Sequence, residues 1–187
     1  QQLRQLGKEV FLDLKFHDIP NTVKQASQQA VLQGASMFNY HASGGSNMMR
    51  QGVEAARNYA REKGLRIPLI IGVTVLTSMN EQDLAGIGLG DEPGRIVAKW
   101  AKLAQASGLD GVVASPWEIG LIREACGPDF KIVCPGDDQK RYLTPREAIA
   151  RGADYLVIGR PVTRAANPSE AAQLIYEEIG EGFQART

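Results

Sequence analysis

Charged side chains cluster in the run FLDLKFHDIP, which occupies residues 11 to 20. Asp13, Lys15, His17 and Asp18 fall within six positions there, at the end of an apolar stretch that is typical of a buried strand. A carboxylate beside an ammonium group could serve catalysis at a strand end, or it could form a structural ion pair. Burying two charges usually costs more than it returns unless they serve a purpose, so the pattern favours catalysis.

Strand geometry predicts where two of these charges point. Residues two apart share a face of a strand, so Asp13 and Lys15 should point to one side, and Leu12, Leu14 and Phe16 to the other. In a barrel of parallel strands the apolar face packs on helices. We therefore expect Asp13 and Lys15 to project into the barrel at the carboxyl end of the strand, where enzymes of this architecture keep their active sites.

Asp18 allows two interpretations. The run Asp18-Ile19-Pro20-Asn21-Thr22 leads into a helix, so Asp18 could cap that helix, with Pro20 in its first turn. The other interpretation places Asp18 in an active site, and the pattern alone favours neither.

The two histidines, His17 and His41, lie at or near expected strand ends. A site role is conceivable, but a lone histidine more often makes structural hydrogen bonds. Neither has a second histidine or a carboxylate at metal-ligand spacing, so no metal site is predicted.

Six short apolar runs alternate with longer segments of helical period, which indicates a parallel sheet covered by helices. Amphipathic segments are expected to be crossover helices, each ending on a glycine suited to a left-handed helix cap. The expected helices cover 23–34, 47–64 and 94–108, and the expected strands cover 10–14, 36–40, 68–76, 111–115, 131–135 and 154–159.

This even spacing, with no G-x-G-x-x-G after any strand, favours an α/β fold of the (β/α)8 TIM barrel class over a doubly wound sheet. A closed barrel uses about 250 residues, or about 30 per unit, so six units fall two short. We therefore expect residues 1–187 to form a single barrel domain that lacks its first units, roughly 60 residues.

Three helix starts share one chemistry: a capping side chain, a proline at the first helical position, and a glutamate that can reach back to the cap. Ser115 follows a strand but has no histidine partner nearby, so we interpret it as a cap and not as a nucleophile. The three starts are Ser115-Pro116-Trp117-Glu118, Thr144-Pro145-Arg146-Glu147 and Asn167-Pro168-Ser169-Glu170.

Composition narrows the possible partners. Twenty-one basic and 21 acidic residues cancel, and no run is rich in lysine or arginine, so nothing indicates binding to nucleic acid or to a membrane surface. The expected partner is a small molecule. Cys126 and Cys134 make neither a disulfide framework nor a metal cluster, which favours a reducing cytoplasm. No apolar run approaches the roughly 20 residues that span a bilayer.

The run Asp13-x-Lys15-x-x-Asp18-Ile19-Pro20-Asn21-Thr22 resembles the D-x-K-x-x-D-I-P-N-T motif of the orotidine 5'-monophosphate decarboxylase family. Five further segments look like family segments in family order, which chance does not explain. They are His41-Ala42-Ser43-Gly44-Gly45, Val75-Leu76-Thr77-Ser78-Met79, Gly108-Leu109-Asp110-Gly111-Val112-Val113, Thr144-Pro145 and Val157-Ile158-Gly159-Arg160-Pro161-Val162-Thr163.

The resemblance implies decarboxylation of orotidine 5'-monophosphate to uridine 5'-monophosphate in de novo pyrimidine synthesis, without a cofactor. It implies that Lys15 stabilises the carbanion at C6 of the pyrimidine and then protonates it, while Asp13 sits beside the departing carboxylate. Asp18 would reach into the partner subunit's site, so a homodimer with shared sites is expected. The implied substrate-binding residues are Ile19, Thr22, Thr77, Gln139, Gly159 and Arg160, with Gln139 and the last two at the phosphate.

Residue chemistry supports part of this set independently. Gly159 and Arg160 follow the last expected strand, where barrels of this kind bind phosphate, and arginine offers a bidentate match to that group. A surface arginine after a strand is common, however, and a threonine at a strand end, such as Thr77, can simply cap the next turn.

The sequence departs from the family pattern in two places. No strand ending in a ribose-binding aspartate or in a further lysine precedes the motif. In addition, Pro135-Gly136 runs directly into Asp137-Asp138-Gln139, without the longer arginine-containing loop of the family. The first departure agrees with the expected lack of two units.

Two alternatives stay open. Magnesium-dependent sugar-phosphate decarboxylases and hexulose-phosphate synthases use D-x-K-x-x-D on the same barrel, but they differ in the I-P-N-T continuation. A non-catalytic nucleotide-binding barrel is the other alternative. The intact charge cluster argues against it, because a binding protein has no reason to keep costly buried charges.

Overall fold

The computed structural model describes residues 2–90, 92–136 and 143–186 of the chain. The chain divides into two compact units. The first unit comprises Gln1–Thr74 and Lys99–Val112, and the second comprises Val75–Ala98 and Val113–Thr187. The organisation of residues 1–187 as a single domain stays a prediction.

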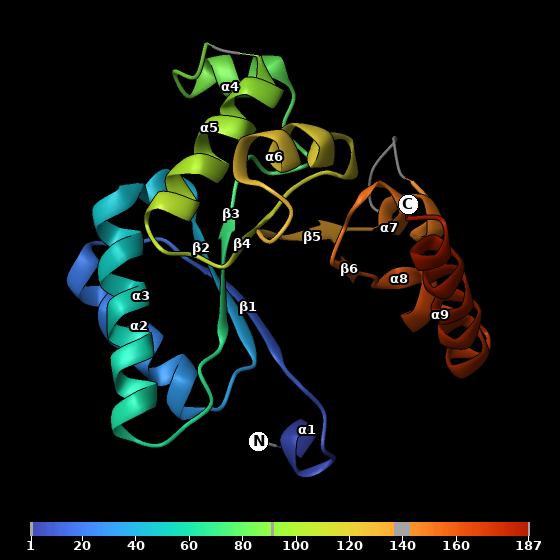
Figure 1. Cartoon of the computed structure of the whole chain (residues 1–187), viewed down its shortest axis with the longest axis horizontal. Helices are drawn as coiled ribbons and strands as arrows, with labels where there is room; N and C mark the ends of the chain where they lie inside the picture. Colours follow the sequence, from blue (N-terminus) through green and yellow to red (C-terminus); the bar gives the residue numbers. More distant parts are fainter. Residues whose placement is uncertain (1, 91, 137–142, 187) are drawn as a thin grey trace. The chain divides into compact units, whose positions relative to one another are not determined.

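Three parallel strands form the sheet of the first unit (Figure 1). β1 (Phe11–Phe16) pairs with β2 (Met37–His41), and β2 pairs with β3 (Leu69–Val73). Four of the five residues of β2 are buried, which explains why this strand is almost continuously apolar in sequence. Asn39 is the polar exception among these four buried residues.

Two crossover helices, α2 (Pro20–Leu32) and α3 (Gly45–Glu62), pack against each other beside these strands (Figure 1). A short helix, α1 (Gln2–Gln5), precedes β1, and a 3-10 turn (Ala42–Gly44) leads from β2 into α3. The core between helices and sheet contains the fully buried side chains of Val23, Phe38, Tyr40, Met48, Met49, Ile70 and Ile71.

Tyr40 requires a glycine on the facing helix. Its ring is buried, and its hydroxyl lies 2.8 Å from the hydroxyl of Ser27, which donates to the carbonyl oxygen of Val23. A Cβ at Gly52 of α3 would lie 2.5 Å from the Tyr40 hydroxyl oxygen. Gly52 therefore lets α3 approach the sheet closely enough to enclose the tyrosine.

The expected helix ends are confirmed. Gly34, Gly64 and Gly108 follow the crossover helices with φ of 73°, 61° and 86°. After the first of these helices, the Gly34 N–H donates to the Val31 carbonyl and the Ala35 N–H donates to the Ala30 carbonyl, which is the Schellman pattern.

An aspartate fixes the start of β3 in the first unit. Asp110 Oδ2 accepts the Ile70 N–H at 2.8 Å, and the Asp110 N–H donates to the Ile70 carbonyl at 2.8 Å. Arg57 of α3 donates to Asp110 Oδ1 at 2.8 Å and to the Gly108 carbonyl at 2.9 Å. We call this arrangement the Gly-x-Asp clamp, because it uses the glycine that ends a helix and the aspartate two residues later.

The second unit repeats this clamp at the start of β5 (Lys131–Pro135). Asp154 Oδ2 accepts the Ile132 N–H at 2.8 Å, and Arg123 donates to Asp154 at 2.6 Å and to the Gly152 carbonyl at 2.7 Å. A reduced form stands at the start of β1, where Ser36 replaces the aspartate and its hydroxyl accepts the Val10 N–H at 3.3 Å.

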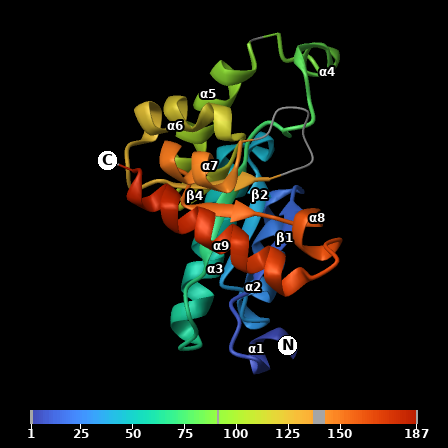
Figure 2. The same cartoon turned by 90° about the vertical axis from the view of Figure 1, so that its right-hand side faces the viewer.

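In the second unit, β5 and β6 (Tyr155–Val157) pair in parallel, with Val133 opposite Tyr155. The C-terminal helix α9 (Pro168–Gln184) packs on α7 (Pro145–Arg151), as Figure 2 shows. The unit also contains α4 (Glu81–Gly86), a 3-10 turn (Pro116–Glu118), α6 (Ile119–Cys126) and α8 (Arg160–Thr163). Two elements, α5 (Pro93–Ala106) and β4 (Gly111–Val113), have residues in both units.

Two of the three expected capping boxes are confirmed in full. The side chains of Ser115 and Thr144 each accept a backbone N–H, and the glutamate three residues later accepts the N–H of the cap residue. The third differs, because Glu170 accepts the side-chain amide of Asn167 at 3.2 Å instead of its backbone N–H. Asn167 still accepts the Glu170 N–H, so it caps α9.

All six expected strands exist, but several bounds differ. The third, expected over 68–76, ends at Val73 because the following residues leave the ladder. The fourth, expected to 115, ends at Val113 because Ser115 begins a capped turn. Among the described residues, no helix is both long enough and apolar enough to cross a membrane.

Gly182 sets the distance between α7 and α9. A Cβ there would lie 2.7 Å from the Arg146 carbonyl oxygen and 2.8 Å from Ile149 Cβ. Gly180, on the same helix, has nothing within 4 Å of its Cβ position.

Gly182→Ala should therefore lower the free energy of unfolding by about 1–3 kcal/mol, because the methyl group forces the two helices apart. Gly180→Ala is the matched control and should raise it by about 0.5–1 kcal/mol through helix propensity. Urea unfolding followed by circular dichroism measures both. Equal effects of the two substitutions would contradict the close helix contact.

The carboxyl group of Glu118 accepts the Ser115 N–H in the capping box and is also largely buried. Burial raises its pKa to about 7 and the charge of Glu92 adds to the rise, although the Ser115 N–H bond acts in the opposite direction. An ordinary glutamate in the unfolded chain titrates near 4.5. Between these values the folded state keeps a proton that the unfolded chain has released, so stability falls as pH rises.

In Glu118→Gln, the free energy of unfolding should fall by about 1–3 kcal/mol less between pH 5 and 7.5 than in the wild type. The reason is that the amide keeps an acceptor for the Ser115 N–H but does not titrate. Glu147→Gln is the control, because Glu147 occupies the same cap position at an exposed site. Urea unfolding at several pH values measures the slope. An unchanged slope in Glu118→Gln would count against the buried titration.

Candidate active site

The end of β1 carries an ion pair between the two residues that strand alternation placed together. Lys15 Nζ lies 2.7 Å from Asp13 Oδ2, and the two side chains are 38% and 44% exposed. The pair is thus neither buried in the core nor fully in solvent. It remains accessible to a small molecule.

The backbone that carries this pair is irregular. Leu12 lies opposite Phe38 and Phe16 lies opposite Tyr40, so β1 advances four residues where β2 advances two. Lys15 lies within this bulge at φ 51°, and it is the one non-glycine residue with positive φ in the described part of the chain. A left-handed conformation is unfavourable for lysine, and such strain often marks a functional position.

The bulge also changes the other face of the strand. Leu14 was expected on the packed side with Leu12 and Phe16, but its side chain is 58% exposed. The expectation for Leu14 is wrong because regular alternation does not continue through a bulge.

Asn39 joins the bulge to the ion pair, and the sequence analysis missed it. Its Oδ1 accepts the Lys15 N–H at 2.7 Å, and its Nδ2 donates to Asp13 Oδ1 at 2.6 Å. The residue is fully buried. The available signal was a lone amide inside the buried strand SMFNY, where polar side chains are rare unless they have partners.

These contacts keep Asp13 charged. Partial burial acts to raise the pKa of Asp13, but hydrogen bonds from Lys15 and Asn39 and the positive charge of Lys15 outweigh it. The pKa of Asp13 is therefore below its ordinary value. An anion and a cation stay paired at this strand end under ordinary conditions.

The two histidines lie beside the same strand ends. The rings of His17 and His41 are 5.4 Å apart between centroids, inclined at 49°. Burial lowers the pKa of His41, and the neighbouring His17 and Lys15 lower it further. No group of three metal-binding side chains occurs among residues 2–90, 92–136 and 143–186.

Asp18 does not cap α2. The N-cap position belongs to Ile19 and has no side-chain cap hydrogen bond, so the cap interpretation is wrong. Asp18 Oδ1 instead accepts the N–H of Ile19 at 2.7 Å, and the residue is exposed. Ile19 is 67% exposed, and Thr22 is also exposed on the first turn of α2.

The remaining site residues belong to the second unit. Thr77 follows β3 and lines a cavity of about 660 Å³ together with Asn80, Trp117 and Glu118. Gly159 and Arg160 follow β6, where Gly159 is the N-cap of α8 and Arg160 its first residue. Gln139 lies outside the described residues.

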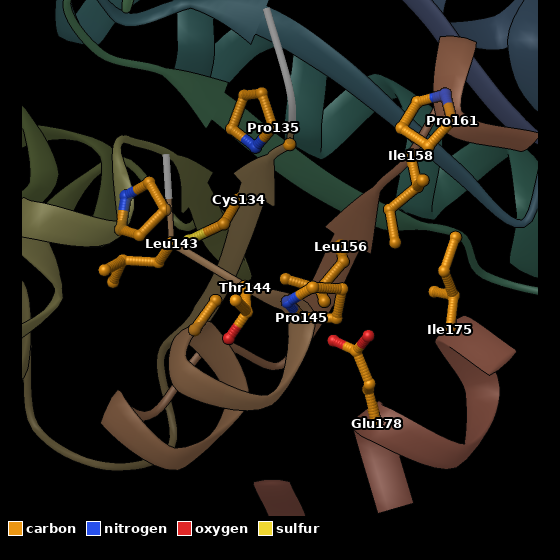
Figure 3. Close-up of a pocket in the computed structure, with 13 residues that line it drawn as sticks. Cys134, Pro135, Leu143, Thr144, Pro145, Leu156, Ile158, Pro161, Ile175 and Glu178 are labelled. Atoms are coloured by element: carbon orange, nitrogen blue, oxygen red, sulfur yellow. The ribbon is translucent and has the colours of Figure 1, made fainter. Parts of the chain in front are cut away.

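A second cavity of about 260 Å³ opens between β5, β6, α7 and α9 (Figure 3). Cys134, Leu156, Ile158 and Ile175 line it, and the carboxylate of Glu178 points toward it (Figure 3). Burial raises the pKa of Cys134 to about 12, so its thiol stays protonated and is a poor nucleophile. None of the predicted site residues that the structure describes lines this cavity.

Comparisons with known proteins cover nearly all of the chain. A profile of the "Orotidine 5'-phosphate decarboxylase / HUMPS family" matches residues 1–175. The chain is 50% identical over 195 aligned positions to the orotidine 5'-phosphate decarboxylase of Syntrophus aciditrophicus, covering 100% of this chain and 78% of that protein. For the enzyme of the same name from Geotalea daltonii, identity is 52%, covering 97% of this chain and 79% of that protein.

Solved structures agree with these relatives. The crystal structure of orotidine 5'-phosphate decarboxylase from Lactobacillus acidophilus superimposes with a TM-score of 0.85 at 36% identity, covering 95% of this chain and 78% of that one. The enzyme from Pyrococcus horikoshii gives a TM-score of 0.72 at 28% identity, covering 95% and 77%. The fold class predicted from the sequence, a (β/α) barrel with six strand–helix units present, is confirmed. The chain belongs to the orotidine 5'-phosphate decarboxylase / HUMPS family.

Proposed function

We propose that this protein decarboxylates orotidine 5'-monophosphate to uridine 5'-monophosphate in pyrimidine biosynthesis, without a cofactor. The observation that carries the proposal is the Lys15–Asp13 pair, held 2.7 Å apart at a strand end in a chain about 50% identical to enzymes of that name. Its geometry places a fixed cation at the carboxyl end of a parallel strand, where barrel enzymes react.

The reaction breaks the bond between C6 of the pyrimidine and its carboxylate, and carbon dioxide leaves. The electron pair stays on C6, and the ring offers no sink for it. The ammonium group of Lys15 stabilises this developing charge, because a cation that is already in place needs no reorganisation during the reaction. Lys15 then donates a proton to C6, giving uridine 5'-monophosphate, and recovers a proton from solvent.

Asp13 has two roles in this scheme. Its carboxylate orients the Lys15 ammonium group through the contact at 2.7 Å. It also sits beside the carboxylate that departs. Because its pKa is below the ordinary value, Asp13 remains an anion and keeps the neighbouring lysine in place.

The remaining residues bind the rest of the nucleotide. Gly159 and Arg160 hold the phosphate after β6, and a planar guanidinium suits bidentate contact with that group. Gln139 contacts the same phosphate. Ile19, Thr22 and Thr77 contact the substrate elsewhere.

The active form is a homodimer in which Asp18 enters the partner subunit's site. What supports this is that Asp18 is exposed just beyond β1 and is not used to cap α2. The cytoplasmic location inferred from the two cysteines stays a prediction.

Lys15→Ala in the full-length protein should lower kcat at least about 100- to 1000-fold, because the fixed cation and the proton donor are both lost. Lys24→Ala, an exposed lysine on α2, is the control and should turn over normally. The fall in ultraviolet absorbance as substrate is decarboxylated measures turnover. Equal rates in both variants would overturn the mechanism, and loss of wild-type activity with a chelator would favour the magnesium-dependent alternative.

Mixing Lys15→Ala chains with Asp18→Ala chains should restore part of the activity that neither variant shows alone. One of the two sites in each mixed dimer would contain both an intact Lys15 and an intact Asp18. The same absorbance assay, run on dimers isolated with two different affinity tags, measures the recovery. Mixed dimers that stay inactive would refute shared sites.

A further inference from the structure

The side-chain amide of Asn39 makes two hydrogen bonds, and its two partners allow only one orientation of the amide. The Lys15 N–H needs an acceptor and receives Oδ1, while the Asp13 carboxylate needs a donor and receives Nδ2. Reversing the amide would face a donor with a donor and an acceptor with an acceptor. The orientation of Asn39 is therefore set by these two partners together.

The first contact compensates for the bulge in β1. Between Leu12 and Phe16, β1 advances four residues while β2 advances two, so the regular ladder of backbone hydrogen bonds is interrupted there. The Asn39 side chain supplies the acceptor that Lys15 receives in that gap. It thereby helps to hold Lys15 in a left-handed conformation, at φ 51°, that lysine rarely adopts.

The second contact acts on the other member of the ion pair. Asp13 receives Asn39 on Oδ1 and Lys15 on Oδ2, so each oxygen has its own donor. A rigid amide that touches the backbone of one residue and the carboxylate of the other fixes their relative position. Because Asn39 is fully buried, substrate at the exposed side of the pair does not need to touch it.

We propose that Asn39 is a positioning residue for decarboxylation, which holds the Lys15 backbone and the Asp13 carboxylate in register so that the ammonium group meets C6 of the substrate. This inference rests on the proposed function for its kinetic consequence. Its structural part, the control of Asp13 by Asn39, is independent of any reaction.

Two substitutions separate the two contacts. Asn39→Ala removes both and should lower kcat by about 10- to 100-fold with KM changed less than about threefold, since misplacement of a reacting group affects the chemical step more than binding. Asn39→Asp keeps the acceptor for Lys15 and preserves volume, but it donates to Asp13 only while protonated.

Asn39→Asp should therefore gain a pH dependence that the wild type lacks. As pH rises, the shared proton leaves, two carboxylates repel, and the ratio of variant to wild-type kcat should fall. The ionisable groups that face Asn39 and the ion pair are Asp13, Lys15, His17 and His41, and all four are present in both proteins. A change in the ratio with pH therefore reports the carboxyl group introduced at position 39 and its coupling to Asp13.

Tyr40→Phe is the matched control on the neighbouring position of β2. It loses a buried hydrogen bond to Ser27 and some stability, but it leaves the contacts of Asn39 intact. Its kcat should equal that of the wild type. A loss equal to that of Asn39→Ala would show that any damage to β2 has the same effect, and would overturn the inference.

A titration of the Asp13 carboxyl carbon by NMR gives a readout that needs no substrate. The pKa of Asp13 should rise in Asn39→Ala and stay unchanged in Tyr40→Phe. An unchanged pKa together with kcat within twofold of wild type in a folded Asn39→Ala protein would refute the role of Asn39. If the wild type does not decarboxylate the nucleotide, the proposed function fails, and the NMR titration alone decides the positioning role.

Discussion

The buried amide of Asn39 is the interaction on which the geometry of the charged strand end depends. An exposed ion pair between two flexible side chains defines little by itself, because solvent screens it and both chains lose entropy in forming it. Asn39 adds a rigid, fully buried group that binds the backbone of Lys15 and the carboxylate of Asp13. The pair therefore has a fixed position, although the side chains of Lys15 and Asp13 remain 38% and 44% exposed.

Backbone clamps stand at the starts of two strands, and the proposed site residues stand at or beyond the carboxyl ends of strands. At the strand starts, the Gly-x-Asp clamps bind Ile70 and Ile132 through Asp110 and Asp154, each supported by an arginine. The proposed site residues stand elsewhere on their strands: Lys15 lies near the end of β1, Thr77 lies after β3, and Arg160 begins α8 after β6. A barrel can vary the residues at one end without loosening the other, which is the division of labour typical of this architecture.

The sequence predicted the elements well because their causes are local. Periodicity and helix-ending glycines indicated six strands and their crossover helices, and strand alternation predicted that Asp13 and Lys15 lie together, as they do in the ion pair. It could not predict the bulge at Lys15 or the part of Asn39, because both depend on pairing between residues 24 to 26 apart in the chain. The exposure of Leu14 belongs to that same irregular stretch and was missed with it. The pattern alone favoured neither interpretation of Asp18, and the N-cap of α2 is Ile19.

The Gly-x-Asp clamp has a consequence for how such a chain can arise. Each clamp joins two neighbouring strands. An aspartate between a helix end and the later strand binds the earlier strand, and an arginine on the helix before the earlier strand binds that aspartate. Gly108-Leu109-Asp110 and Gly152-Ala153-Asp154 repeat the same solution, and Gly34-Ala35-Ser36 repeats it with a hydroxyl. A gene segment that encodes two consecutive helix–strand modules therefore encodes one complete clamp. Duplication of such a segment would copy the hydrogen bonds that hold the strand starts together. The loops at the opposite strand ends could then change in sequence without loss of these bonds.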